Sequence, residues 1–244
     1  MKQLLLLMLS FSSFSRPLMI AHAGGGINGM NYTNSLEAMD ANYAKGFRYF
    51  ELDFSWTSDN ELVCLHDWKK RFKKVFGYKL KKPLTFQQFQ KILIKTKSVH
   101  PCTPETLAQW LIKHPDARVI TDVKHNNLQA ITKLRDYYPS MMPQFIIQFY
   151  QPYEYQALKK LGFKDLIWIL YQYDGSKKSV ITEAQKMNLV AISMRASQAK
   201  KKTYQQLLKL GKKIFVYTIN KQDKVNKLHN IYGVTGFYTD FLNP

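Results

Sequence analysis

Two carboxylates and a histidine in residues 50–67, FELDFSWTSDNELVCLHD, have the types and the spacing for chemistry. Glu51 and Asp53 are two residues apart in an apolar run, and a strand, with its period of two, would direct both to one face. Two acids on one face repel each other, and their burial is unfavourable unless a cation lies between them. We therefore expect them to hold a divalent metal ion. The competing interpretation is a surface hairpin that happens to carry acids.

The rest of this stretch would bring the histidine to the same place. Residues 58–61 (SDNE) form a turn-forming cluster, and residues 62–66 alternate like a second strand. A hairpin folded about residues 59 and 60 would place Asp53 opposite His66. The apolar residues between the acids would then point the other way, so the acids would face the interior.

The remainder of the chain alternates strand patterns with helix patterns. Apart from the second arm of the hairpin, the predicted strands begin at Leu18, Phe47, Arg118, Phe145, Leu166, Leu189, Ile214 and Gly236. This α/β order predicts a TIM (β/α)8 barrel with a β-hairpin extension after its second strand. A doubly wound dinucleotide-binding fold is disfavoured because no strand is followed by GxGxxG.

In a TIM barrel, functional side chains lie at the carboxyl ends of the strands. The ends predicted here carry His22, Glu51, Asp53, Asp122, Lys124, Gln148, Arg195, Tyr217, Asn220 and Asp240. With Asp122, the two acids of the second strand would make a hard oxygen site that suits Mg²⁺ or Ca²⁺. Lys124 would share the face of Asp122 and help to clamp a phosphate. His22 and His66 would flank this site as general base and general acid, which is the equipment for breaking a phosphodiester P–O bond.

The composition of the chain indicates which classes of partner to expect. The chain has 244 residues and a formal net charge of +19, which favours an anionic partner such as a phosphate or an anionic membrane surface. Nucleic acid is not expected, because no helix-turn-helix, zinc-finger or RNP-type pattern is present. The basic, aromatic residues 68–82 predict either a lid that attracts anions or a solvated loop. Cys64 and Cys102 are too few for a disulfide framework, and free thiols are expected rather than one bridge.

The chain is expected to divide into a short leader and one barrel domain, residues 17–244. Residues 1–16 contain an apolar run after Lys2, which predicts either a signal peptide or an N-terminal capping segment. Export would place the protein in the periplasm or outside the cell, and otherwise it would be cytoplasmic. Further along, Asn34 is expected to cap a helix, with Glu37 as its capping-box partner.

The pattern AHAGG, TNSLEA, FELDF, HD, TDVK, YTIN and GFYTD resembles the glycerophosphodiester phosphodiesterase family over nearly the whole chain. The resemblance implies a TIM barrel with one divalent metal and two catalytic histidines. It implies that His22 and His66 are the acid–base pair and that Glu51 and Asp53 are metal ligands. Asp122 would replace a family glutamate as the third ligand, and Lys124 matches a family lysine that binds substrate.

The chain departs from the family pattern at two further positions. Ala23 stands where the family has arginine, so Arg195 or a basic residue of segment 69–82 would have to supply the missing phosphate contact. Tyr217 stands where the family has tryptophan, next to the substrate. The Asp-x-Lys of residues 122–124 is also similar to that of sphingomyelinase D-like phospholipases, and phosphatidylinositol-specific phospholipases C share the two-histidine arrangement.

These features predict a metal-dependent phosphodiesterase that hydrolyses glycerophosphodiesters to an alcohol and a glycerol phosphate. The cofactor would be one divalent cation, Mg²⁺ or Ca²⁺. The partners would be a small phosphodiester or a lipid headgroup, with peripheral contact to an anionic membrane. The alternatives are a phospholipase of the C or D type that acts on intact lipid, and a barrel without catalysis that binds anionic headgroups.

Overall fold

The computed structural model describes residues 16–244. The segment expected to be a signal peptide or a capping segment therefore lies outside the described residues, except for its last residue, Arg16. Among the described residues, no helix has the length and apolar character to cross a bilayer.

Nine strands of residues 16–244 make one sheet. They are β1 (Leu18–Ala21), β2 (Tyr49–Trp56), β3 (Leu62–Cys64), β4 (Arg118–Val123), β5 (Phe145–Phe149), β6 (Leu166–Ile169), β7 (Ala191–Arg195), β8 (Ile214–Tyr217) and β9 (Gly236–Thr239). Every pairing is parallel except that of β2 with β3, and pairing of β1 with both β9 and β2 closes the ring. The TIM barrel and its hairpin extension are thus confirmed.

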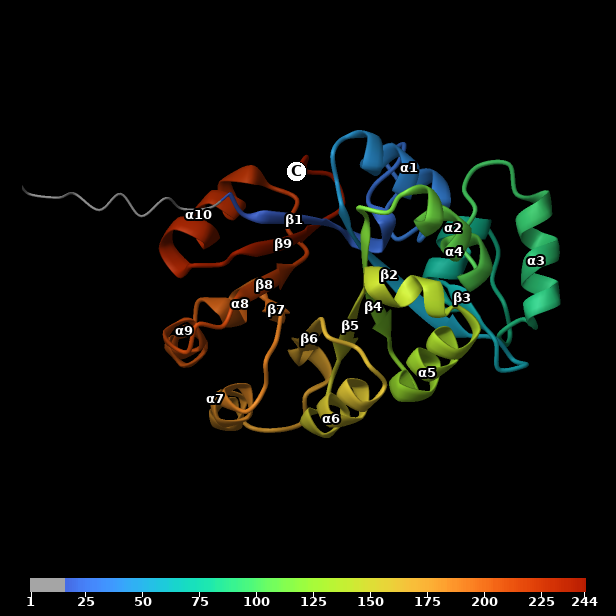
Figure 1. Cartoon of the computed structure of the whole chain (residues 1–244). Helices are drawn as coiled ribbons and strands as arrows, with labels where there is room; N and C mark the ends of the chain where they lie inside the picture. Colours follow the sequence, from blue (N-terminus) through green and yellow to red (C-terminus); the bar gives the residue numbers. More distant parts are fainter. Residues whose placement is uncertain (1–15) are drawn as a thin grey trace, which may run out of the picture.

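Helices surround this ring, as Figure 1 shows for α5, α6, α7 and α9. They are α1 (Leu36–Ala44), α2 (Lys70–Phe76), α3 (Phe86–Lys95), α4 (Pro104–Lys113), α5 (Asn127–Tyr137), α6 (Pro152–Lys160), α7 (Lys177–Gln185), α8 (Ala196–Ala199), α9 (Lys202–Lys209) and α10 (Gln222–Tyr232). Short 3₁₀ turns cover His22–Gly24, Pro139–Gln144 and Leu170–Gln172. Apolar faces of the strands and helices pack together in the main core, which includes Phe50, Leu52 and Phe54 of β2.

Inward-facing side chains of seven strands form an apolar cluster inside the barrel. It consists of Ile20, Ile120, Ile146, Ile167, Ala191, Phe215 and Tyr238. Glu51 is in register with Ile120 of this cluster, and Asp53 is in register with Asp122, two residues closer to the carboxyl ends. Because side chains on a strand alternate, the acids point inward while the neighbouring aromatic residues point to the helices, as expected from the sequence.

The register of the hairpin differs from the prediction by one residue. Phe54 pairs with Cys64, whereas placing Asp53 opposite His66 would pair Phe54 with Leu65. The cause is the turn, because Thr57 pairs with Glu61 across a three-residue loop instead of a two-residue one. Asn60, in the left-handed region at φ 60°, ends that loop. His66 lies beyond the end of β3 and reaches the barrel mouth from a bend.

Two other local predictions are wrong. Ser35, not Asn34, caps α1, and its side chain accepts a hydrogen bond from the backbone of Ala38. Cys64 and Cys102 form a disulfide instead of remaining free thiols, since the end of β3 pairs with the segment that precedes α4. Whether two cysteines form a disulfide depends on their distance in the fold, which the number of cysteines in the sequence does not show.

The basic segment 68–82 contains a helix, α2, in addition to loop. Phe72 on this helix is buried and packs with Val63, Leu65 and Phe89 in a separate small core. The lysines of the helix remain exposed. The segment is therefore anchored by its aromatic residues and presents its charge outward.

Candidate active site

A pocket of about 190 Å³ opens at the carboxyl ends of the barrel strands. All eight site residues predicted from the sequence line it: His22, Glu51, Asp53, His66, Asp122, Lys124, Arg195 and Tyr217. They come from β1, β2, β4, β7 and β8 or the segments that follow these strands, and from the bend after β3. The barrel therefore gathers side chains from 22 to 217 into one small volume.

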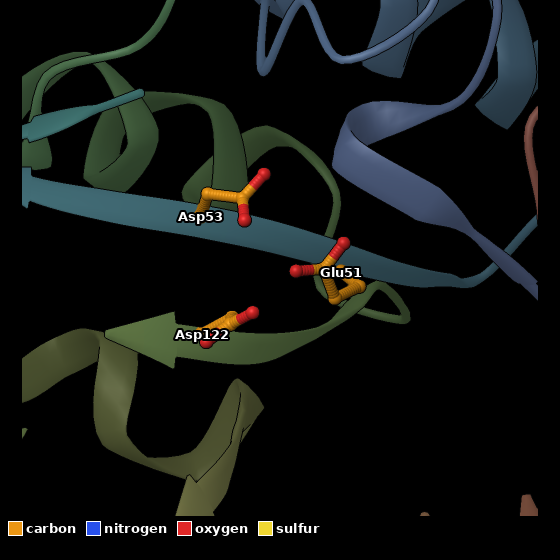
Figure 2. Close-up of side chains that lie close together, drawn as sticks. All are labelled: Glu51, Asp53 and Asp122. Atoms are coloured by element: carbon orange, nitrogen blue, oxygen red, sulfur yellow. The ribbon is translucent and has the colours of Figure 1, made fainter. Parts of the chain in front are cut away.

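Three carboxylates lie together in this pocket (Figure 2). Oxygens of Glu51, Asp53 and Asp122 are all within 4.8 Å of one another, and the three residues are buried. Figure 2 shows the two acids of β2 and Asp122 of β4 directed into the same space. A buried set of three carboxylate oxygens is a donor set for a hard divalent cation such as Mg²⁺ or Ca²⁺.

The electrostatics of the cluster agree with that donor set. Burial, together with the charge of Asp53, raises the pKa of Glu51. Burial also raises the pKa of Asp53, but attraction by Lys124, His66 and His22 outweighs it and the net shift is downward. Lys124 Nζ lies 2.7 Å from Asp53 Oδ1 and 3.5 Å from Asp122 Oδ2. One ammonium therefore offsets part of the charge of the three acids, and the site keeps an affinity for further positive charge.

His22 is held at the edge of the cluster by a carboxylate of the last strand. Its Nδ1 donates to Asp240 Oδ1 at 2.8 Å, and its Nε2 lies 3.9 Å from Glu51 Oε2. Asp240 Oδ2 accepts from the amides of Asn31 and Asn220. Burial alone would lower the pKa of His22, but the hydrogen bond to Asp240 and the nearby carboxylates raise it.

His66 has a carboxylate at the same ring position. Its Nδ1 donates to Asp67 Oδ2 at 2.9 Å, while Asp67 Oδ1 accepts from the backbone N–H groups of Lys69 and Arg71 at the start of α2. A carboxylate at Nδ1 fixes the orientation of an imidazole and leaves Nε2 available to the pocket. Both histidines thus have the same arrangement.

Tyr32 lies between the two histidines. Its ring centroid is 4.5 Å from that of His22 and 5.2 Å from that of His66, with edge-on geometry in both cases. The guanidinium of Arg71 is 3.5 Å from the Tyr32 centroid on the ring face. The Tyr32 ring therefore separates and positions the two imidazoles, and no pattern in the sequence predicted this arrangement.

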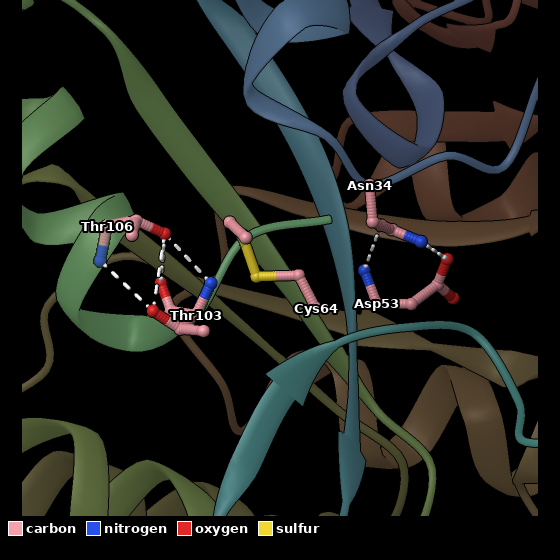
Figure 3. Close-up of a disulfide and its surroundings, with 6 residues drawn as sticks. Asn34, Asp53, Cys64, Thr103 and Thr106 are labelled. Atoms are coloured by element: carbon pink, nitrogen blue, oxygen red, sulfur yellow. Dashed lines mark hydrogen bonds between the residues drawn. A yellow bond between two sulfur atoms is a disulfide. The ribbon is translucent and has the colours of Figure 1, made fainter. Parts of the chain in front are cut away.

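Asp53 is fixed by Asn34, which was expected to cap a helix (Figure 3). The Asn34 amide donates to Asp53 Oδ2 at 3.1 Å, and its carbonyl oxygen accepts from the Asp53 backbone at 2.9 Å. The backbone of Cys102 donates to the backbone carbonyl of Asn34, and Cys102 is joined to Cys64 by the disulfide. The disulfide therefore supports the loop that orients Asp53.

Asp122 is held by two tyrosines that sequence reasoning did not select. Tyr150 and Tyr171 each donate a hydrogen bond from the hydroxyl group to Asp122 Oδ1. Tyr150 directly follows β5 and Tyr171 closely follows β6, so their position just past strand ends was the available signal. Asp240 and Asn220 were expected at strand ends, but the pairing of Asp240 with His22, and of Asn220 with Asp240, was not predicted.

Arg195 and Tyr217 occupy the far wall. They are in register on neighbouring strands, β7 and β8. Burial raises the pKa of Tyr217 to about 12, although the positive charge of Arg195 acts in the opposite direction. Ala23 contributes its backbone, whose N–H donates to Glu51 Oε2 at 2.8 Å from a residue with φ of 51°.

Comparison with known proteins decides the family. Residues 23–243 match the model of the glycerophosphoryl diester phosphodiesterase family. The chain belongs to the glycerophosphoryl diester phosphodiesterase family. The comparison with curated proteins found no significant match.

Solved structures of glycerophosphodiester phosphodiesterases share the fold. The enzyme of Thermotoga maritima superimposes with a TM-score of 0.73 at 17% identity, over 93% of this chain and 95% of the other. The one from Agrobacterium tumefaciens gives a TM-score of 0.65 at 15% identity, over 92% and 96%. A phosphodiesterase from Oleispira antarctica, solved in complex with the product sn-glycerol-3-phosphate, gives 0.67 at 14% identity, over 92% and 93%.

Proposed function

We propose that this chain hydrolyses glycerophosphodiesters to an alcohol and a glycerol phosphate, with His22 and His66 as the acid–base pair and one divalent cation held by Glu51, Asp53 and Asp122. The family match and the neighbour that binds sn-glycerol-3-phosphate support the substrate class. The single observation that carries the mechanism is the shared pocket, where two imidazoles with carboxylates at Nδ1 face three clustered acids.

The chemistry of the acids defines the role of the cation. When bound, Mg²⁺ or Ca²⁺ would stabilise the negative charge that develops on the phosphoryl oxygens. Tyr150 and Tyr171 hold Asp122, and Asn34 holds Asp53, so the ligand oxygens are fixed before the cation arrives. Lys124 completes the positive surface on which the phosphate rests.

The two imidazoles move the protons. One accepts the proton of the attacking hydroxyl at Nε2, and the other donates a proton to the leaving oxygen at the same ring position. The attacking group is a substrate hydroxyl next to the phosphate, which gives a cyclic phosphate that water then opens. Asp240 and Asp67 keep the rings oriented for both transfers.

The missing arginine at position 23 is replaced by Arg195 in this proposal. Arg195 lines the pocket, whereas Arg71 of the basic segment lies on the ring of Tyr32 and does not line it. Tyr217, next to Arg195 in the register, contributes a buried hydroxyl to the same wall.

Product analysis tests the proposal. Purified protein is incubated with glycerophosphoethanolamine, glycerophosphoglycerol or an intact diacyl phospholipid, with Mg²⁺, Ca²⁺ or EDTA. We expect cation-dependent release of glycerol phosphate from the water-soluble diesters. Release of phosphatidate or diacylglycerol alone would assign the lipid alternative, and binding without any product would assign the non-catalytic one.

We also propose that the exposed lysines of α2 contact an anionic membrane. Lys70, Lys73 and Lys74 are exposed on a helix anchored by Phe72. Lys74 also donates to Asn31, a neighbour of Asp240, so this helix lies close to the pocket. Each lysine near such a surface contributes about 1 kcal/mol. Sedimentation with phosphatidylglycerol vesicles, but not with phosphatidylcholine vesicles, is the expected result, and equal recovery with both would reject this contact.

We propose a periplasmic or secreted location, in which residues 1–16 act as a signal. The disulfide supports it, because such bonds persist in oxidising compartments. Fusing residues 1–16 to a reporter that is active only after export should give activity. A cytoplasmic reporter would overturn the proposal.

A further inference from the structure

A second cavity adjoins the catalytic pocket. It has a volume of about 600 Å³, compared with about 190 Å³ for the catalytic pocket, and the two share His66 and Lys124. The larger cavity has the size of a ligand site, whereas the smaller one has room for little beyond a phosphate and a short polyol. A substrate bound by its phosphate next to His66 would therefore have one substituent in each space.

The lining of the second cavity is mainly apolar and is held in place. Phe54, Trp56, Trp68, Leu80 and Pro83 contribute apolar surface. The indole N–H of Trp68 donates to the backbone oxygen of Trp56 at 2.7 Å, and that of Trp56 donates to His125 at 2.8 Å. Because the polar atoms of both indoles are used in these bonds, the rings offer only apolar surface to an occupant.

The charges around this cavity are nearly all positive. Lys69, Lys81, Lys82 and Lys124 line it, and Asp67 is the one acid among its lining residues. Asp67 is already occupied by His66 and by two backbone N–H groups of α2. Aromatic residues can hold a quaternary ammonium, but here the surrounding ammonium groups would repel it.

We propose that this cavity binds the second ester substituent of the phosphodiester, and that the preferred substituent is bulky, apolar and without positive charge. The inference rests on the proposed function and makes the substrate an amphiphilic glycerophosphodiester rather than one with a cationic headgroup. Its basis is that the two spaces adjoin, with His66 and Lys124 lining both, and that the charges around the larger one are mainly positive.

A series of esters with equal leaving-group chemistry tests the size and the polarity of the cavity. Ethyl, butyl and hexyl esters of glycerol phosphate are assayed below the concentrations at which they form micelles. We expect kcat/KM to rise about two- to fourfold for each added methylene. Glycerophosphocholine should be a poorer substrate than the butyl ester. A flat series, or a preference for the choline ester, would overturn the proposal.

A matched pair of variants tests the charge. Lys81→Glu with Lys82→Glu should raise the ratio of kcat/KM for glycerophosphocholine to that for the butyl ester by about fivefold. The control, Lys177→Glu with Lys178→Glu, changes the net charge equally on exposed residues that line neither cavity and should leave the ratio unaltered. Equal ratios in both variants would count against the cavity.

A binding assay tests the cavity independently of the proposed function. If no ester is hydrolysed, the proposed function fails, and the cavity is then tested by titrating tryptophan fluorescence with the ethyl and hexyl esters. Trp56 and Trp68 line the cavity, while Trp110 and Trp168 are buried in the main core. Tighter binding of the hexyl ester supports the cavity, and equal affinities reject it.

Discussion

The Nδ1 atom of His22 lies 2.8 Å from Oδ1 of Asp240, a residue 218 positions further along the chain. The contact joins the ends of the first and last strands, β1 and β9, which are hydrogen-bonded neighbours in the closed ring. Gly26 makes the approach close, because its backbone donates to the Asp240 carbonyl and a Cβ there would meet that oxygen at 2.5 Å. Barrel closure therefore positions one of the two proposed acid–base groups.

Asp240→Asn should lower kcat about 10- to 100-fold, because a neutral amide neither orients the imidazole as firmly nor stabilises its charge. It should also lower the pKa of His22, so the limb of the pH–rate profile that belongs to His22 should move to lower pH. The measurement is kcat against pH. Asp174→Asn, an exposed acid that lines none of the cavities described above, is the control. A reduced kcat with an unmoved profile would assign Asp240 a purely structural role.

Removal of the cation should make the stability of the protein depend on pH. The pKa of Glu51 is raised to about 8, and that of His22 is raised as well. Groups whose pKa rises on folding stabilise the folded state at low pH, and this contribution is lost as pH rises through the folded pKa. In EDTA we therefore expect Tm to fall between about pH 5 and pH 8.

Bound Mg²⁺ or Ca²⁺ should remove most of this fall, and affinity for the cation should increase over the same pH range as Glu51 loses its proton. Glu51→Gln should show a shallower fall in EDTA and little stabilisation by the cation. Thermal unfolding scans measure both effects. If the cation stabilises Glu51→Gln as much as the unaltered protein, Glu51 is not a ligand.

The Cys64–Cys102 disulfide closes a segment with a sequence separation of 38. A loop of that length predicts a loss of about 3–4 kcal/mol of unfolding free energy for Cys64→Ser with Cys102→Ser, measured by urea unfolding. Because Cys102 supports the loop of Asn34, cation affinity should also fall, and calorimetric titration would show it. If the variant is less stable but binds the cation with unchanged affinity, the disulfide does not support the metal site.

Much of the barrel was predictable from the sequence, because its strands are short apolar runs between clear helices. Strands β4 and β5 begin at the residues that their patterns predict. The inward direction of Glu51 and Asp53 also followed from the two-residue period of β2. These features depend on local periodicity, which a single sequence records.

The rest depends on contacts between distant segments. The hairpin register differs because loop length, which sequence patterns specify poorly, determines which residues pair. Asn34 leaves its expected capping role because it can reach Asp53 from a neighbouring loop. Tyr32, placed between two histidines by the loop after β1, gave no periodic or compositional signal.

Arg195→Ala should raise KM severalfold or more with a smaller effect on kcat, because the guanidinium is proposed to bind phosphate in both the ground state and the transition state. Steady-state kinetics with a glycerophosphodiester measures this. Arg135→Ala, which removes a guanidinium paired with Asp136 on the surface, is the matched control. An unchanged KM would remove Arg195 from the substrate site.

The most direct test of the two-histidine site is the turnover of His22→Ala and His66→Ala at saturating cation and substrate. Each variant should keep a Tm close to that of the unaltered protein in the presence of the cation and lose about 10²- to 10⁴-fold in kcat. Near-normal turnover in either folded variant would contradict the account, because the carboxylate cluster would then cleave the diester without the imidazole assigned to it.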